Sequence, residues 1–198
     1  MSLLRAFIAL EIPPAIQHHI HEATAALRNA TAALIRWVPR ENLHLTLKFL
    51  GDISPASVEL LTQMIRAEAD SCPSFEMQLS GLASFPSLQR PRVIYIGIQA
   101  PAGLEALRHG IESAARRLGY ESENRGFSPH LTIGRVKQNV TASDQQKIRR
   151  ALEETKIDSL GSTRVDSVHL YKSDLKPSGS VYTRLFSAPL KKIQPQRL

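Results

Sequence analysis

Two short segments of the chain alternate strictly between polar and apolar residues and begin with the same residue type. The first reads His-Leu-Thr-Leu from His44, and the second reads His-Leu-Thr-Ile from His130. Strict alternation is typical of a strand with one face in the core, because successive side chains point to opposite faces. Each His therefore shares a face with the Thr two positions on, Thr46 or Thr132. The pattern predicts two strands that each present an imidazole and a hydroxyl on one face.

The segments around these two strands follow the same order in both halves of the sequence. Apolar or alternating runs predict strands, and apolar residues at every third or fourth position predict helices. In the first half the expected elements are a strand over 4–12, a helix over 15–34, the His44 strand, a helix over 55–70 and a strand over 75–82. In the second half they are a strand over 92–99, a helix over 102–118, the His130 strand, a helix over 143–154 and a strand over 164–171, with a last strand over 181–190.

This repetition predicts a duplicated strand–helix–His strand–helix–strand unit, with the two histidines 86 positions apart (130 − 44). A duplication of this kind is expected to give two lobes related by an approximate two-fold axis. The two His strands would then face each other across a central groove. Chance occurrence of the motif in two unrelated strands is the alternative, and the matched order of the elements disfavours it.

Composition and charge narrow the class of protein. The chain has 198 residues, of which 42% are hydrophobic and 22% charged, as in ordinary globular proteins. A net charge of +7 and a pI near 9.9 favour an anionic partner, with nucleic acid or a nucleotide as the first candidate. The alternative is a protein that is basic without such a partner.

Other sequence features indicate the compartment. Cys72 is the only cysteine, so no internal disulfide can form and a reducing compartment is expected. The apolar stretch near the start is interrupted by Glu11 and is too short for a signal peptide. No run approaches the length of a membrane span. We therefore expect a cytoplasmic protein with no membrane partner.

The paired motifs suit acid–base chemistry on a phosphate. Histidine titrates near pH 6.5, so at neutral pH one ring can be neutral and another protonated. Two such rings on opposite sides of a phosphodiester can deprotonate an attacking water and protonate the departing oxygen. Threonine hydroxyls can donate hydrogen bonds to the phosphate oxygens, where charge develops. This scheme needs neither a metal nor another cofactor.

Two basic residues extend the motifs. Lys48 is expected on the face of His44, since 48 − 44 is even, although a lysine at a strand end is often only solvated. Arg135 is displaced by one register from His130, since 135 − 130 is odd, and would need a twist or bulge at Gly134 to reach the groove. The planar guanidinium of an arginine there would suit a phosphate clamp.

Some of the remaining aromatic and histidine residues are weaker candidates. Phe127 and Tyr171 could stack on a base, although core packing is the simpler interpretation of each. His18, His21 and Glu22 would share one face of a helix. With no fourth ligand nearby, a solvated polar face is a better explanation of this cluster than a metal site.

Taken together, these residues resemble the signature of the 2H phosphoesterase superfamily. The motifs that carry the resemblance are His44-Leu-Thr-Leu-Lys-Phe-Leu-Gly51 and Pro129-His-Leu-Thr-Ile-Gly-Arg135. Within the superfamily, the chain is most similar to the bacterial and archaeal RNA 2′,3′-cyclic phosphodiesterases, long called 2′-5′ RNA ligases. Further similarities lie at 5–10, 37–39, 42–47, 127–130 and 170–173, so the resemblance covers nearly the whole chain.

The resemblance implies an α+β, bilobal, duplicated fold with two small antiparallel sheets around a central groove and helices packed outside. It implies one domain over residues 1–198, made of two pseudo-symmetric lobes. It also implies metal-independent opening of a 2′,3′-cyclic phosphate, on RNA or a nucleotide, to the 2′-phosphate. In that scheme His130 is the base, His44 the acid, and Thr46 and Thr132 hold the phosphate. Arg135 matches a position that is basic in many relatives.

Two other functions remain open at this point. The resemblance also implies reversible 2′-5′ joining of RNA ends, which microscopic reversibility permits but which water at high concentration disfavours. The other possibility is an RNA-binding module without turnover, and the two intact motifs argue against it. We expect a monomer, because the duplication already supplies both halves of the site.

Overall fold

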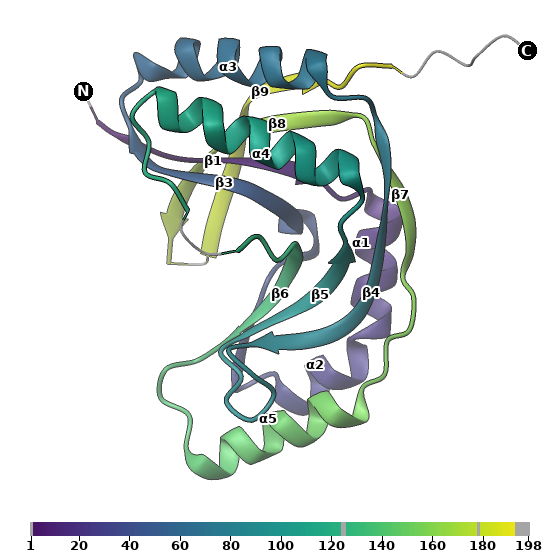
Figure 1. Ribbon diagram of the computed structural model, residues 1–198. Coiled ribbons are helices and arrows are strands. Elements are labelled where there is room, and N and C mark those ends of the chain that lie inside the picture. The colour runs from purple at the N-terminus through teal and green to yellow at the C-terminus, as the bar shows by residue number, and fades with distance from the viewer. Residues whose placement is uncertain (1, 124–125, 178, 193–198) are drawn as a thin grey trace, which may run out of the picture.

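Two antiparallel β-sheets, each with helices packed beside it, make up the computed structural model of the protein (Figure 1). The structure describes residues 2–123, 126–177 and 179–192. The strands of the first sheet are, in spatial order, β3 (His44–Ile53), β1 (Leu4–Glu11), β8 (Ser167–Lys176) and β9 (Gly179–Pro189). Those of the second sheet are β2 (Ile35–Trp37), β6 (His130–Val136), β5 (Val93–Gln99), β4 (Phe75–Phe85) and β7 (Gly161–Val165). These sheets confirm the predicted fold class.

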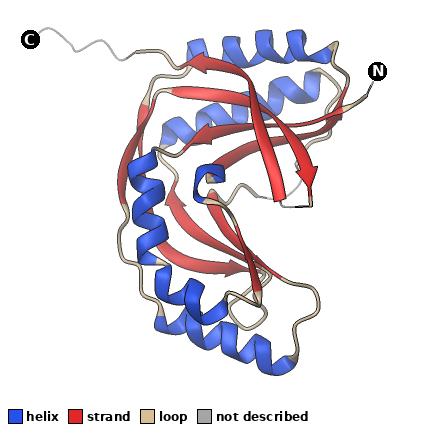
Figure 2. Cartoon of the chain, turned by 180° about the vertical axis from the view of Figure 1, so that it is seen from behind, coloured by secondary structure: helices blue, strands red, loops and turns tan. Residues whose placement is uncertain are grey.

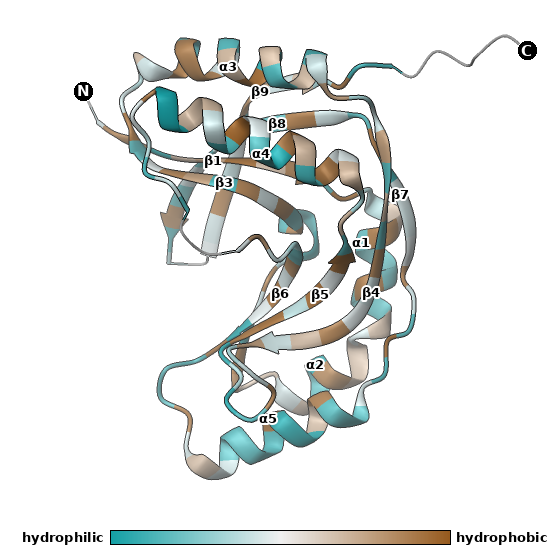
Figure 3. Cartoon of the chain, viewed as in Figure 1, coloured by the Kyte–Doolittle hydropathy of each residue, from teal (hydrophilic) through white to brown (hydrophobic). Residues whose placement is uncertain are grey.

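The helices divide between the two sheets (Figures 1 and 2). They are α1 (Pro14–Ala23), α2 (Ala25–Thr31), the 3-10 turn η1 (Arg40–Asn42), α3 (Ser57–Ser71), α4 (Ala102–Arg117) and α5 (Ala142–Glu154). Helices α3 and α4 pack together over the first sheet, whereas α1, α2 and α5 lie beside the second. Helix α5 is hydrophilic along most of its length (Figure 3) and buries Ile148 and Leu152. The core therefore lies between each sheet and its helices, and the opposite sheet faces stay free for a site.

Apart from β2, the two sheets share one order of strands, and each sheet combines strands from both halves of the chain. In each sheet the His strand is followed by the first strand of its own half, giving β3-β1 and β6-β5. The next strand comes from the other half, because β8 pairs with β1 and β4 pairs with β5. The predicted repeat in the order of elements is therefore confirmed. Because each sheet takes strands from both halves of the chain, one repeat unit does not form one lobe by itself.

Three boundaries differ from the prediction. The helix expected over 15–34 breaks at Thr24, whose hydroxyl donates to the carbonyl of Ile20 at 2.7 Å and competes with the helical pattern. The connection expected at 37–39 is preceded by strand β2, which is too short for periodicity to reveal. The strand expected over 164–171 is two strands, because the chain crosses between the sheets at Asp166.

Candidate active site

The two His strands lie where the sheets approach each other. Strands β3 and β6 are in contact, and each begins at its motif histidine. Among the residues that the structure describes, β3 is an edge strand, and β2 pairs only with the far end of β6, from Gly134 to Val136. The part of β6 that carries His130 is therefore also an open edge, and both motifs border the space between the sheets.

Both motif histidines make the same hydrogen bond. Nδ1 of His44 lies 2.7 Å from the carbonyl oxygen of Asn42, and Nδ1 of His130 lies 2.8 Å from that of Ser128. A carbonyl oxygen only accepts, so Nδ1 carries the proton in each neutral ring. Nε2 of each ring is then left to accept or donate a proton. Burial lowers the pKa of His44, although its hydrogen bond to the Asn42 carbonyl raises it in part.

Aromatic rings hold both imidazoles in place, again in a similar way. The ring of His44 lies 4.8 Å from Phe7 and 5.2 Å, edge on, from Tyr182. The ring of His130 lies 5.0 Å from Phe85 and 5.3 Å from Tyr95, edge on to both. Such packing restricts the side-chain rotamers and fixes the direction of each free nitrogen.

A β-bulge interrupts each His strand at the same point. In β3, Thr46 is opposite Ala9 and Lys48 opposite Ile8, which leaves Leu47 as the extra residue. In β6, Ile133 is the extra residue by the same criterion, since Thr132 is opposite Tyr95 and Gly134 opposite Ile94. A bulge shifts the alternation by one. The fourth residue after each His therefore turns to the core, and the fifth returns to the His face.

The bulge overturns the prediction for Lys48. Its side chain is buried on the helix side, where Nζ donates to Glu112 of α4 at 2.8 Å and to the carbonyl of Glu121. Burial alone would raise the pKa of Glu112, but hydrogen bonds from Lys48 and the Glu123 backbone hold it below its usual value. Lys48 is thus half of a structural ion pair and does not line the groove.

The equivalent bulge in β6 places Arg135 on the same face as His130 and Thr132. Arg135 is opposite Val93 in the β5–β6 ladder. Val93 lies on the same face of β5 as the residues opposite Thr132 and His130, so Arg135 shares a face with these two residues. The residue is exposed, and within the described residues it forms no ion pair. The sequence predicts a twist or bulge at Gly134, and the extra residue of the observed bulge is Ile133, one position earlier.

Phe49 is a candidate that alternation from His44 missed. It occupies in β3 the position of Arg135 in β6, is 64% exposed, and lies 6.2 Å from the ring of Phe7. Its exposed ring lies on the same face as His44 and Thr46, where it could stack on a ligand. Aligning His-Leu-Thr-Leu-Lys-Phe with His-Leu-Thr-Ile-Gly-Arg would have paired it with Arg135.

The two aromatic residues named from the sequence have different surroundings. Tyr171 stacks on Phe7 with centroids 5.4 Å apart and lines a cavity of about 270 Å³ beside His44. Phe127 packs against the core, with the guanidinium of Arg108 5.0 Å over its ring. One face of Phe127 is therefore already covered, whereas Tyr171 lies next to a space that a ligand can enter.

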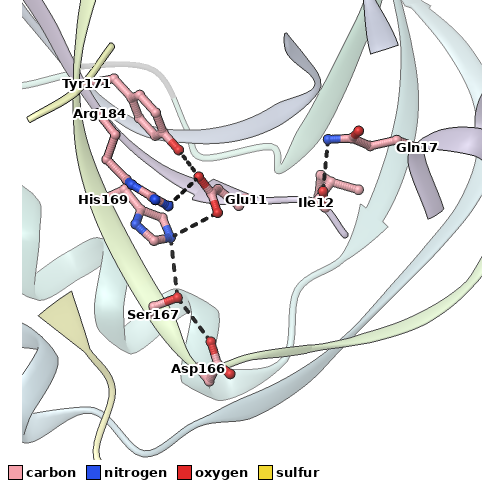
Figure 4. A network of polar contacts seen from close by, with 8 residues as sticks. All are labelled: Glu11, Ile12, Gln17, Asp166, Ser167, His169, Tyr171 and Arg184. Carbon is pink, nitrogen blue, oxygen red and sulfur yellow. Dashed lines mark hydrogen bonds and ion pairs between the residues drawn. The ribbon is translucent and has the colours of Figure 1, made fainter. Parts of the chain in front are cut away.

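A polar network centred on Glu11 is shown in Figure 4, and two of its members, Glu11 and Tyr171, line this cavity. Glu11, at the end of β1, accepts hydrogen bonds from the hydroxyl of Tyr171 and, at 3.0 Å, from the guanidinium of Arg184. His169 is buried, with Nε2 3.8 Å from the Glu11 carboxylate. Burial raises the pKa of Tyr171, so its hydroxyl remains a donor. The full lining is Phe7, Glu11, Ile12, Pro14, Gln17, Glu41, Asn42, Leu43, His44, Tyr171 and Tyr182.

The geometry can be compared with known proteins. The model of the 2′-5′ RNA ligase superfamily matches residues 3–177 of the chain. The chain belongs to this superfamily. A relative from Methanothermobacter thermautotrophicus, an RNA 2′,3′-cyclic phosphodiesterase, is 31% identical over 180 residues, covering 91% of this chain and 95% of the relative. One of the same name from Escherichia coli K12 is 35% identical over 133 residues, 65% of this chain and 70% of the relative.

Solved structures show the same fold. TT0787 of Thermus thermophilus superposes with a TM-score of 0.81 at 25% identity, covering 96% of this chain and 100% of the other. E. coli LigT complexed with 3′-AMP superposes with a TM-score of 0.75 at 28% identity, covering 95% and 98%. The resemblance to 2H phosphoesterases is confirmed.

The structure also bears on metal and membrane binding. Within the described part of the chain, no three or more His, Cys, Asp or Glu residues are grouped to hold a metal ion. Nε2 of His18 instead lies 3.3 Å from the carboxylate of Glu22 on the exposed face of α1. Every helix within residues 2–123, 126–177 and 179–192 is too short or too polar to cross a membrane.

Proposed function

We propose that the protein is an enzyme that hydrolyses the 2′,3′-cyclic phosphate of an RNA end or nucleotide to the 2′-phosphate, without a metal ion. The observation that carries this proposal is the matched pair of imidazoles. Each has Nδ1 bound to a backbone carbonyl, and Nε2 has no partner among the described residues, on strands that are in contact between the sheets. Relatives named RNA 2′,3′-cyclic phosphodiesterase, at 31% identity over nearly the whole chain, support the substrate class.

The proposed reaction uses both rings once. Nε2 of His130 accepts a proton from water as the water oxygen bonds to phosphorus. The bond from phosphorus to the 3′ oxygen breaks, and that oxygen takes the proton held on Nε2 of His44. The hydroxyls of Thr46 and Thr132 donate hydrogen bonds to the non-bridging oxygens, whose charge increases in the transition state. Protons and charge balance without a further reactant.

The surrounding residues bind the rest of the substrate in this proposal. Arg135 binds a phosphate of the RNA through its planar guanidinium. Phe49 and Tyr171 offer aromatic surface to a base, which suits substrates that differ in base identity. Each half of the chain contributes one His, so residues 1–198 are one catalytic domain and a monomer suffices.

The pH dependence of the reaction tests these roles. A general acid must be protonated, so activity falls as the pH rises through its pKa. Burial lowers the pKa of His44 in the free protein, whereas a bound anionic diester favours its protonated form. We therefore expect bell-shaped profiles near neutrality, with the basic limb of kcat/KM at lower pH than that of kcat.

Rates measured with a nucleoside 2′,3′-cyclic phosphate in excess EDTA, between about pH 5 and pH 9, would show both limbs. A profile with a single limb would contradict two titrating imidazoles. A basic limb of kcat/KM at higher pH than that of kcat would contradict the assignment of the acid to His44.

A further inference from the structure

Two arginines lie directly opposite each other on the catalytic side of the second sheet. Arg36 of β2 is the ladder partner of Arg135 of β6, and both residues are exposed. Directly opposed residues have Cβ atoms about 5 Å apart and share a face, and like charges there destabilise the pair. Among the described residues neither arginine forms an ion pair. The arrangement keeps two positive charges together with no protein anion to offset them.

The packing of β2 fixes the direction of Arg36. Its neighbours Ile35 and Trp37 lie over Gly134, where an added Cβ would come within 2.8 Å of Ile35 Cγ2 and 2.9 Å of Trp37 Cε3. Successive strand residues alternate between faces, so Arg36 points to the opposite side from Ile35 and Trp37. That is the side of Arg135 and, through the β5–β6 register, of His130.

The arginine pair lies a short distance along the strand from Thr132, which the proposed reaction places at the reacting phosphate. Thr132 is opposite Tyr95, and Arg135 is opposite Val93, two positions further along β5. At about 3.3 Å per residue this places the pair roughly 7 Å along the strand from the threonine. That separation is suited to the next phosphate of an RNA strand.

We propose that Arg36 and Arg135 form a second phosphate subsite, which binds the backbone phosphate next to the cyclic end of an RNA. This inference rests on the proposed function and adds a preference for oligonucleotide ends over mononucleotides. The first sheet has no counterpart, because β3 carries Phe49 at the equivalent position and, among the described residues, no strand lies outside it. The subsite therefore also gives the bound RNA one direction across two similar lobes.

The test compares two substrates that differ by one nucleotide. These are a nucleoside 2′,3′-cyclic phosphate and a dinucleotide with one internal phosphate and the same cyclic end. For Arg36→Gln we expect kcat/KM to fall about tenfold on the dinucleotide and to change less than twofold on the mononucleotide. Arg116→Gln, an equal charge change at an exposed position of α4, should alter neither.

Equal losses on both substrates, no loss on the dinucleotide, or the same loss in Arg116→Gln would overturn the proposal. A binding measurement distinguishes failure of this subsite proposal from failure of the proposed function. Fluorescence anisotropy with a labelled dinucleotide ending in a 3′-phosphate needs no turnover, and Arg36→Gln should weaken this complex about tenfold. It should also reduce the salt dependence by roughly one charge. If the wild type opened no cyclic phosphate but this binding difference appeared, the reaction would be wrong and the subsite would stand.

Discussion

Replacement of either His44 or His130 by Ala is expected to lower kcat for hydrolysis of a 2′,3′-cyclic phosphate by about 10²–10⁴-fold. Each ring handles a different proton, and the aromatic residues around it cannot replace its Nε2 atom. Binding of an RNA that ends in a 3′-phosphate should change little, because both threonines and Arg135 remain. Steady-state kinetics and anisotropy on the same preparations would measure both effects.

His109→Ala is the matched control for the histidine variants, since His109 is exposed on α4, a helix that carries none of the motif residues. Its kcat should equal that of the wild type. The double variant of His44 and His130 should lose less than the product of the single losses, because the two rings act in one step. Activity that survived both single replacements would show the acid–base scheme to be wrong.

Thr46→Val and Thr132→Val are each expected to reduce kcat by about 10²-fold with little change in fold stability. Valine has nearly the shape of threonine but cannot donate to the phosphate oxygens as charge develops on them. Both positions are only partly buried, so the lost hydroxyl leaves no large buried polar defect. Kinetics together with thermal denaturation would separate the catalytic effect from a folding effect.

The threonine variants have an internal control in serine. Thr46→Ser and Thr132→Ser keep the hydroxyl and lose a methyl group, so they should retain most of the activity. Serine variants as inactive as the valine variants would assign the threonines to packing. Valine variants within threefold of the wild type would remove both hydroxyls from the mechanism.

Alternation identified the motif strands, but pairing between strands decides which residues share the catalytic face. Leu47 and Ile133 fit the apolar positions of their strands, so nothing in the local sequence distinguishes them as extra residues. The bulges appear only when β1 and β5 supply partners. For this reason alternation from His44 puts Lys48 on the wrong face and overlooks Phe49. The bulge in β6 gives Arg135 the irregularity that it needs to share a face with His130.

The exchange of strands between the halves was also beyond the sequence pattern. Periodicity predicts that β4 and β8 exist, but it contains no information on which sheet each joins. The crossing at Asp166 therefore looked like one continuous strand. Strand β2, with three residues, is too short to show any period, and yet it places Arg36 beside Arg135. Repeated motifs and long elements carry enough local pattern to be predicted from the sequence, whereas short strands and sheet membership do not.

Phosphorus NMR of the product tests the central claim most directly. The purified protein would be incubated with an RNA ending in a 2′,3′-cyclic phosphate in excess EDTA, with the His130→Ala variant alongside. We predict complete conversion to a 2′-phosphate by the wild type and almost none by the variant. A 3′-phosphate would contradict the roles given to His44 and His130, and no conversion would contradict the assignment of a metal-free cyclic phosphodiesterase.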